Sequence, residues 1–358
     1  MLRKRDVVLH MPKQQNWIIN PEVDLVNTLA GYGRFLENDY RMAIEHMSVP
    51  IHFEEYNEPT GRRFVIIGAK SVPGATAKSV FLCLKLAGAS SIAVKAPTLD
   101  EYFMILNVIH HHNTQDIPIE VFSNTSEELR NDQKWASILD EASDLVIFGG
   151  KETADVFEAY SNEFRKVWIH GPKFSFGVAR SYNLTPTTIR DICQDFYSFY
   201  GEGCLSPKFY VIVGEVSQEL FDELSNYMQA FCGNDIDEFR GKLPLTRKSE
   251  LAQQFVSAKY RGKYVREEKL NSSKIFTTLY GDARFVVVDD LEELDDFIQK
   301  WSTEISTVAV DLNDDEVLDI LESHLVTRIC NYGDMQFPDF FEQFDVVDDF
   351  DIYVGDEE

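Results

Sequence analysis

A cysteine in a glycine-rich loop is the side chain of this sequence best suited to covalent chemistry. Cys204 lies in the segment Tyr200-Gly201-Glu202-Gly203-Cys204-Leu205-Ser206-Pro207. Two glycines just before a cysteine allow a tight bend and a close approach to a ligand. A thiolate is also the strongest common nucleophile among protein side chains. The segment therefore predicts a thiol that attacks a carbonyl carbon, unless Cys204 is one of the many free cysteines that only fill space in a core.

The hydrophobic pattern on either side of this loop predicts the elements that hold it. Residues 186–199 have the apolar spacing of an amphipathic helix, and the apolar run 209–213 after the loop is typical of a buried strand. The pattern continues with a helix at 217–231, a strand at 285–288 and an acidic helix at 291–301. We therefore expect the loop to lie at the start of a strand in an α/β domain.

A second alternation of strands and helices lies upstream of this domain. The predicted strands are residues 64–67, 91–94, 117–122, 144–148 and 166–169. Strands joined through helices form parallel sheets, and doubly wound sheets bind ligands outside the carboxyl ends of their strands. The pattern thus predicts a doubly wound sheet whose candidate binding loops are residues 68–74, 95–98 and 149–152.

Two of these loops carry residues suited to a dinucleotide. Lys95 follows the second strand, where a lysine pairs with a ribose hydroxyl or a 2′-phosphate, and the neutral Thr98 does not repel that phosphate. Gly149 and Gly150, with Lys151 at the start of a predicted helix, offer backbone N–H groups to a pyrophosphate. A surface lysine and a plain tight turn explain the same residues, and the first loop lacks the Gly-x-Gly-x-x-Gly spacing.

Composition narrows the possible partners and the compartment. The chain of 358 residues is long enough for two domains, and its formal net charge of -26 argues against nucleic acid and anionic membranes as partners. No apolar run reaches membrane-spanning length, and the N-terminus lacks the pattern of a signal peptide. Five cysteines without metal-type spacing indicate reduced thiols and a cytoplasmic protein. The tract His110-His111-His112 lacks accompanying ligands, so we expect a solvated helix end and no metal site.

Several segments, taken in their order along the chain, resemble a known family. They are Val146-Ile147-Phe148-Gly149-Gly150, Lys173-Phe174-Ser175-Phe176-Gly177-Val178-Ala179, Gly203-Cys204-Leu205-Ser206-Pro207, Thr327-Arg328-Ile329-Cys330 and Gly333-Asp334-Met335-Gln336-Phe337-Pro338. Residues 63–338 are thereby similar to the aldehyde dehydrogenase superfamily, and more closely to the acyl-CoA reductases of the bacterial luminescence type, which make fatty aldehydes. The resemblance implies an aldehyde-dehydrogenase-like α/β fold, in which a doubly wound dinucleotide-binding domain adjoins an α/β catalytic domain.

The resemblance also implies a reaction. Cys204 would take the acyl group of an acyl-CoA thioester and release CoA. The acyl-enzyme would then accept a hydride from NADPH, with NADH as the alternative cofactor, and release the aldehyde from the thiolate. Aldehyde-oxidising relatives carry a glutamate as general base, but the corresponding stretch here is Ile169-His170-Gly171-Pro172-Lys173. His170 is therefore either a candidate for proton transfer or a histidine that only packs at the end of a strand. The asparagine expected in the first loop is also missing, which leaves Ser71 or backbone alone to hold the oxyanion.

The domain division expected from the sequence has four parts. They are an N-terminal lobe at 1–60, the dinucleotide-binding domain at 61–180, the catalytic domain at 181–325 and a segment at 326–358 that packs on the body or on a partner subunit. We expect a homo-oligomer, with an acyl-donating enzyme as a further partner. A predicted basic helical stretch contains Arg247, Lys248, Lys259, Arg261, Lys263 and Arg266 and either meets CoA phosphates or forms a solvated face. An acyl-phosphate reductase and a non-catalytic scaffolding protein of the same fold are the alternative functions.

Overall fold

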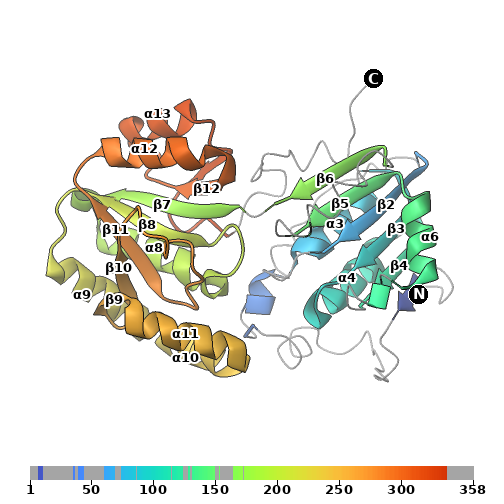
Figure 1. Ribbon diagram of the computed structural model, residues 1–358, viewed down its shortest axis with the longest axis horizontal. Coiled ribbons are helices and arrows are strands. Elements are labelled where there is room, and N and C mark those ends of the chain that lie inside the picture. Colours follow the sequence, from blue (N-terminus) through green and yellow to red (C-terminus); the bar gives the residue numbers. More distant parts are fainter. Residues whose placement is uncertain are drawn as a thin grey trace. The chain divides into compact units, whose positions relative to one another are not determined.

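The structure of the protein is a computed structural model. It describes residues 7–10, 35–36, 39–43, 60–68, 74–85, 87–113, 115–123, 128–129, 131–149, 153, 164–171 and 173–336. The chain forms two compact units, and the boundary between them falls at Pro172 and Lys173. Within the described part of the chain, no helix is long and apolar enough to cross a membrane. Figure 1 labels most of the helices and strands of both units.

The first unit contains a six-stranded sheet in which every neighbouring pair of strands is parallel. The strands are β1 (Val7–His10), β2 (Arg62–Ile67), β3 (Ala89–Lys95), β4 (Ile119–Phe122), β5 (Asp144–Phe148) and β6 (Lys166–His170). Their order is β1-β4-β3-β2-β5-β6, so the winding reverses at β2. The predicted doubly wound sheet is confirmed, and its order reverses between β2 and β5, at whose carboxyl ends sheets of this type bind ligands.

Helices α3 (Ala75–Lys85), α4 (Leu99–His112) and α6 (Gln133–Glu141) accompany this sheet. The sequence Thr98-Leu99-Asp100-Glu101 predicts a capping box that starts a helix, and this start is confirmed, because the side chain of Thr98 caps α4 by accepting a hydrogen bond from the Glu101 amide. Trp135 of α6 packs with Phe122 of β4 at a ring distance of 4.9 Å. Strand β1 falls within the residues predicted as an N-terminal lobe, yet it pairs with β4 as an edge strand of the sheet.

The second unit contains a seven-stranded sheet in the order β13-β12-β7-β8-β11-β10-β9. Its strands are β7 (Phe174–Arg180), β8 (Pro207–Val213), β9 (Lys259–Gly262), β10 (Val265–Glu268), β11 (Ala283–Val288), β12 (Ile305–Ala309) and β13 (Arg328–Cys330). All pairs are parallel except β9 with β10. Strand β7 belongs to this sheet, so the observed boundary lies before β7, whereas the sequence division placed β7 in the first domain.

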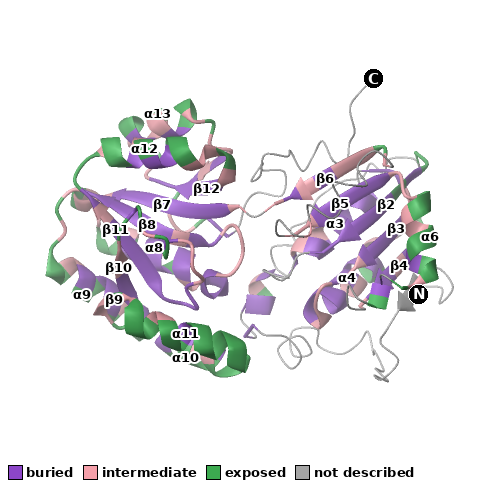
Figure 2. Cartoon of the chain, viewed as in Figure 1, coloured by how far each residue is buried: buried purple, intermediate pink, exposed green. Residues whose placement is uncertain are grey.

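Helices cover this second sheet, and their buried faces form its core. They are α8 (Pro186–Tyr197), α9 (Gln218–Tyr227), α10 (Gly233–Lys242), α11 (Leu245–Ser257), α12 (Leu291–Trp301) and α13 (Asp315–Ser323). The predicted helix at 291–301 is confirmed as α12, whose Phe297 packs on Phe176 of β7 and Phe209 of β8. Figure 2 shows the central strands of the sheet as buried, while the outer faces of α11, α12 and α13 are exposed.

The predicted basic helical stretch is wrong in its second half. Helix α11 ends at Ser257, and the chain then forms the antiparallel pair β9 and β10. Tyr264, in the turn between these strands, has a φ of 63°, which a continuing helix cannot accommodate. Lys259 and Arg261 of β9 both pair with Glu267 of β10, so much of the basic charge is neutralised within the hairpin. The C-terminal segment predicted to pack on the body or a partner lies mostly outside the described residues.

Candidate functional site

Strained backbone and two glycines shape the loop that carries Cys204. Phe199 and Tyr200 have φ values of 53° and 54°, and Gly201 and Gly203 follow with 77° and 88°. Left-handed conformations cost a non-glycine residue of order 1 kcal/mol or more, so the surroundings must enforce them. The fully buried ring of Tyr200 stacks on Phe239 with centroids 4.1 Å apart, and these contacts hold the bend. The predicted tight bend before Cys204 is confirmed.

Every carbonyl from Gly201 to Cys204 accepts a hydrogen bond from a side chain of the same unit. Lys208 Nζ donates to the carbonyls of Gly201 and Gly203 at 3.2 and 3.3 Å. Ser206 Oγ donates to the Glu202 carbonyl. Ser175 Oγ, at the start of β7, donates to the Cys204 carbonyl at 2.6 Å and accepts from the amide of Thr307. The loop is therefore fixed at the start of β8, in the middle of the sheet.

A second loop, residues 331–336, supports the first. Gln336 Nε2 donates to Ser206 Oγ, which links the two loops directly. Asp195 of α8 is completely buried and accepts hydrogen bonds from the amides of Gly333 and Met335, at 2.9 and 3.1 Å. Arg328 of β13 donates to the carbonyls of Asp334 and Met335 on the other side. The segment Gly333–Gln336 thus supports the cysteine loop.

Sequence reasoning missed the roles of Asp195, Ser175 and Lys208. Tyr210 Oη donates to Asp195 Oδ2 at 2.5 Å, and burial raises the pKa of Asp195 to about 7. The ring of Tyr210 lies where a side chain at Gly177 would be, since a Cβ there would come within 2.0 Å of it. Gly177 and Ser175 belong to a segment that carries the family resemblance, but an isolated aspartate on a predicted helix gives no such signal.

Cys204 differs from the other four cysteines in its exposure. All five are described, and Cys204 is partly exposed while the other four are buried. Burial raises the pKa of the Cys83 and Cys193 thiols well above the usual range and that of Cys232 to about 12. Only the thiolate form of a cysteine is a good nucleophile, so these buried thiols are poor candidates for chemistry.

Lys208 is a cationic group that interacts electrostatically with the Cys204 thiolate. Burial lowers the pKa of Lys208, while negative charge on Glu202 and on Cys204 raises it. The attraction between an ammonium and a thiolate is mutual, so the charge of Lys208 also stabilises the thiolate form of Cys204. The second unit therefore combines a reachable thiol, a fixed loop and a local positive charge.

The first unit gathers other predicted residues at the carboxyl edge of its sheet. Lys95 is the last residue of β3 and His170 the last of β6. The register Ile67↔Lys95 and Phe148↔His170 puts both residues at this edge. The Gly149 amide donates to the His170 carbonyl at 3.2 Å, and the His170 ring is buried and stacks on Phe148 at 4.4 Å. His170 thus packs within this edge.

A carboxylate holds the start of α3 and was missed by sequence reasoning. Glu101 of α4 is buried and accepts hydrogen bonds from the amides of Gly74 and Ala77 in the first turn of α3. Burial, followed by repulsion from Asp100, raises the pKa of Glu101 to about 8. The N-terminus of α3, which accommodates the pyrophosphate in ordinary dinucleotide folds, is therefore occupied by a side chain.

Three predicted site residues, Ser71, Gly150 and Lys151, lie outside the described residues. Thr98 lies beside Lys95 but uses its hydroxyl oxygen as the cap of α4. Gly149 is described, and a Cβ there would come within 2.7 Å of Thr153, so a larger residue would displace that side chain. Among the described residues, no group of three or more His, Cys, Asp or Glu side chains is arranged to hold a metal ion.

The fold is that of the aldehyde dehydrogenases, as similar solved structures show. Glyceraldehyde-3-phosphate dehydrogenase GapN from Methanocaldococcus jannaschii DSM 2661, complexed with NADP, matches with a TM-score of 0.65 and 10% sequence identity, covering 91% of this chain and 80% of its own. A putative methylmalonate-semialdehyde dehydrogenase from Sinorhizobium meliloti 1021, complexed with NAD, matches with a TM-score of 0.61 and 12% identity, covering 86% and 73%. No curated protein sequence matches the chain.

Residues 102–349 match the family described as acyl-CoA reductase (LuxC), and the chain belongs to this family. The match includes Cys204, β7, the loop 331–336 and the strands β4, β5 and β6 of the first sheet. The resemblance inferred from the sequence motifs is thereby confirmed, both for the family and for the aldehyde-dehydrogenase-like fold. As a member of this family, the protein is an oxidoreductase that acts on acyl thioesters and forms aldehydes.

Proposed function

We propose that the protein reduces a fatty acyl-CoA to the aldehyde with NADPH, through an acyl-enzyme on Cys204. The observation that carries this proposal is the exposure of Cys204 on a loop whose carbonyls are all held by side chains. A fixed loop limits the motion of its thiol, and such preorganisation contributes to covalent catalysis. Family membership supports the acyl-CoA substrate.

The acyl transfer exchanges one thioester for another. The Cys204 thiolate attacks the carbonyl carbon of the acyl-CoA, a new carbon–sulfur bond forms, and the CoA thiolate leaves with the electron pair of the broken bond. The carbonyl oxygen becomes negative during the attack, and backbone N–H groups of the loop are our candidates to stabilise it, with Ser71 as a further donor. The positive charge of Lys208 favours the thiolate before the attack and after the aldehyde leaves.

The residues of the first unit fit a nicotinamide dinucleotide. When bound, NADPH supplies a hydride to the carbonyl carbon of the acyl-enzyme. Lys95 is the last residue of β3. An acidic residue at this position would bind the ribose hydroxyls of NAD and repel a 2′-phosphate, whereas a lysine favours NADPH. Gly149, at the end of β5, and the adjoining Gly150 and Lys151 are proposed to hold the pyrophosphate, since Glu101 occupies the start of α3. Thr98 is proposed as a neighbour of the ribose, and NADH is the alternative cofactor.

Acid formation is disfavoured because the general-base glutamate of aldehyde-oxidising relatives is replaced by His170. We propose that His170 transfers a proton at the carboxyl edge of the first sheet. Because its ring stacks on Phe148, the alternative is that His170 only positions neighbouring groups. We further predict that the protein self-associates, lies in the cytoplasm and receives its acyl group from a partner enzyme.

The test separates acyl transfer from reduction. Incubation with a long-chain acyl-CoA alone should add one acyl group to the peptide that contains Cys204, and NADPH should then release the aldehyde. Cys204→Ala should abolish both events, while Cys232→Ala, which removes a buried thiol, should retain them. Equal aldehyde formation by Cys204→Ala would refute the mechanism. Faster labelling by an acyl phosphate than by acyl-CoA would instead favour the acyl-phosphate reductase, and no labelling of the folded protein would favour a scaffold.

A further inference from the structure

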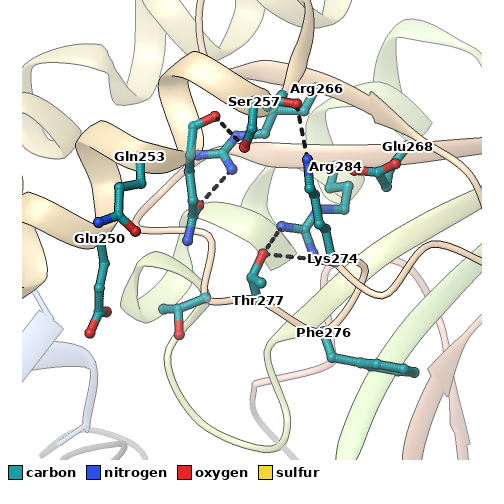
Figure 3. A pocket seen from close by; sticks show the side chains of 12 residues that line it. Glu250, Gln253, Ser257, Arg266, Glu268, Lys274, Phe276, Thr277 and Arg284 are labelled. Carbon is teal, nitrogen blue, oxygen red and sulfur yellow. Dashed lines mark hydrogen bonds between the residues drawn. The ribbon is translucent and has the colours of Figure 1, made fainter.

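A cavity in the second unit, separate from the Cys204 loop, contains a buried arginine that forms no ion pair among the described residues. The cavity has a volume of about 440 Å³ and lies between α11, β10, the following segment and the start of β11. Arg284 is 2% exposed, and its guanidinium donates to the carbonyls of Lys208 and Ile275 and, at 2.7 Å, to Thr277 Oγ1. Figure 3 shows Arg284 and Thr277 meeting at the wall of the cavity.

The charge on Arg284 is costly in the structure as it stands. Burial removes a cation from water, and this is unfavourable unless a carboxylate pairs with the cation. Burial and the charge of Arg266 lower the pKa of Arg284 to about 10, and the negative charges of Glu268 and Asp282 offset this only in part. Asp282 is already engaged by Arg240 and Arg266. An anion in the cavity would supply the missing counter-charge.

The remaining lining matches a phosphate group. Lys274 is exposed, lines the same cavity and donates to the Ser257 carbonyl at 3.3 Å, so its ammonium can turn toward a ligand at little cost. Ser257, Thr277 and Thr278 also line the cavity, and the hydroxyls of Ser257 and Thr277 donate to the carbonyls of Gln254 and Lys274. Glu250 and Glu268 are the carboxylates of the wall, and Glu250 is held by Tyr280 and Arg247. Guanidinium and ammonium groups are the usual partners of phosphate oxygens.

We propose that this cavity is a binding site for a phosphate group, held by Arg284 and Lys274. Phe276, whose ring packs on Phe174 and Trp301, forms an apolar part of the wall beside the charged groups. The phosphate is either free or part of a larger molecule, of which CoA with its 3′-phosphate is the candidate within the protein's own reaction. The phosphate site itself does not depend on the role proposed for Cys204.

Arg284 also connects the cavity to the cysteine loop. Its guanidinium contacts the backbone carbonyl of Lys208, whose ammonium holds the carbonyls of Gly201 and Gly203. The positive charge of Arg284 lowers the pKa of Lys208. An anion bound at Arg284 would therefore reduce this repulsion, so occupancy of the cavity should affect the environment of the thiol.

The experiment measures binding of inorganic phosphate to the full chain, by calorimetry and by thermal unfolding at constant ionic strength. Wild-type protein should bind phosphate saturably and unfold at a higher temperature with it. Arg284→Gln, which can still donate to Thr277, should weaken binding by about tenfold or more, because it removes a charge-assisted contact. Lys274→Gln is a second variant at an exposed position, and it should weaken binding several-fold without affecting folding. Arg190→Gln, an exposed arginine on α8 outside the cavity, is the matched control.

The outcomes distinguish the source of the phosphate and can overturn the proposal. Displacement of phosphate by CoA but not by dephospho-CoA would identify the CoA 3′-phosphate as the ligand. Displacement by neither would identify a free phosphate ligand. The proposal is overturned if phosphate stabilises wild type no more than chloride does, or if Lys274→Gln and Arg284→Gln bind phosphate as tightly as wild type. These measurements do not use the reductase reaction, so they stand even if acylation of Cys204 fails.

Discussion

Replacing Lys208 with methionine tests how the cysteine loop is built. The substitution keeps most of the aliphatic side chain and removes the ammonium that holds the carbonyls of Gly201 and Gly203. Hydrogen bonds from a charged group contribute about 1.5–3 kcal/mol each, and lengths of 3.2 and 3.3 Å put this pair at the lower end. Burial of the ammonium offsets part of that gain. We therefore expect Lys208→Met to lower the free energy of unfolding by about 1–2 kcal/mol.

Lys208→Met should also slow the reaction of the Cys204 thiol with an alkylating reagent, and by more than the loss of stability alone would cause. Loss of the nearby positive charge makes the Cys204 thiolate less stable, and a change of about 1.4 kcal/mol is tenfold in the thiolate population. The assay is the rate of alkylation by iodoacetamide at pH 7, measured on the Cys204 peptide by mass spectrometry, with the four buried cysteines as internal references. Lys208→Met should react about tenfold more slowly.

Two further variants make this test specific. Lys208→Arg keeps the charge and should recover most of the alkylation rate, and Lys242→Met removes a surface lysine of α10 and should change neither rate nor stability. Alkylation of Lys208→Met at the wild-type rate, with the expected loss of stability, would refute the electrostatic part of the reasoning. Faster alkylation would show that the lysine restrains the loop and does not activate the thiol.

Three further predictions concern the supports of the site. Burial raises the pKa of Asp195 to about 7, so between about pH 4 and 7 the folded protein keeps a proton that the unfolded chain releases. The free energy of unfolding should therefore fall as the pH rises from about 4 to 7, and in urea unfolding Asp195→Asn should show a flatter pH dependence over this range. Gly177→Ala should cost about 3 kcal/mol or more, because its Cβ would overlap the Tyr210 ring, whereas Gly171→Ala, with nothing within 4 Å, should unfold like wild type. Ser175→Ala removes a hydrogen bond to the Cys204 carbonyl, and we expect acylation by acyl-CoA to slow by several-fold with the Kd for NADPH unchanged; an unchanged acylation rate would contradict the positioning role of Ser175.

Local pattern predicted much of the fold because most strands and helices here are continuous in sequence. The parallel sheet of the first unit, the cap of α4 by Thr98, the bend at Gly201 and Gly203 and the helix α12 all follow from spacing and residue type within short windows. The family resemblance likewise depended on short segments in a fixed order, and the match over residues 102–349 confirms it. Such features are properties of a stretch of chain, so sequence alone suffices for them.

Contacts between distant parts of the chain decided the rest. Glu101 fills the start of α3, Asp195 holds the loop at Gly333, and Arg284 is buried beside a cavity without an acidic partner among the described residues. None of these residues stands out in its own segment, because burial and partner choice are set by elements far away in the sequence. The hairpin of β9 and β10 was missed for the same reason: its register depends on pairing with β11, and the basic residues alone suggested a helix. Residue types therefore determined which chemistry the chain offers, and tertiary packing determined which of those groups are exposed, charged and held in place.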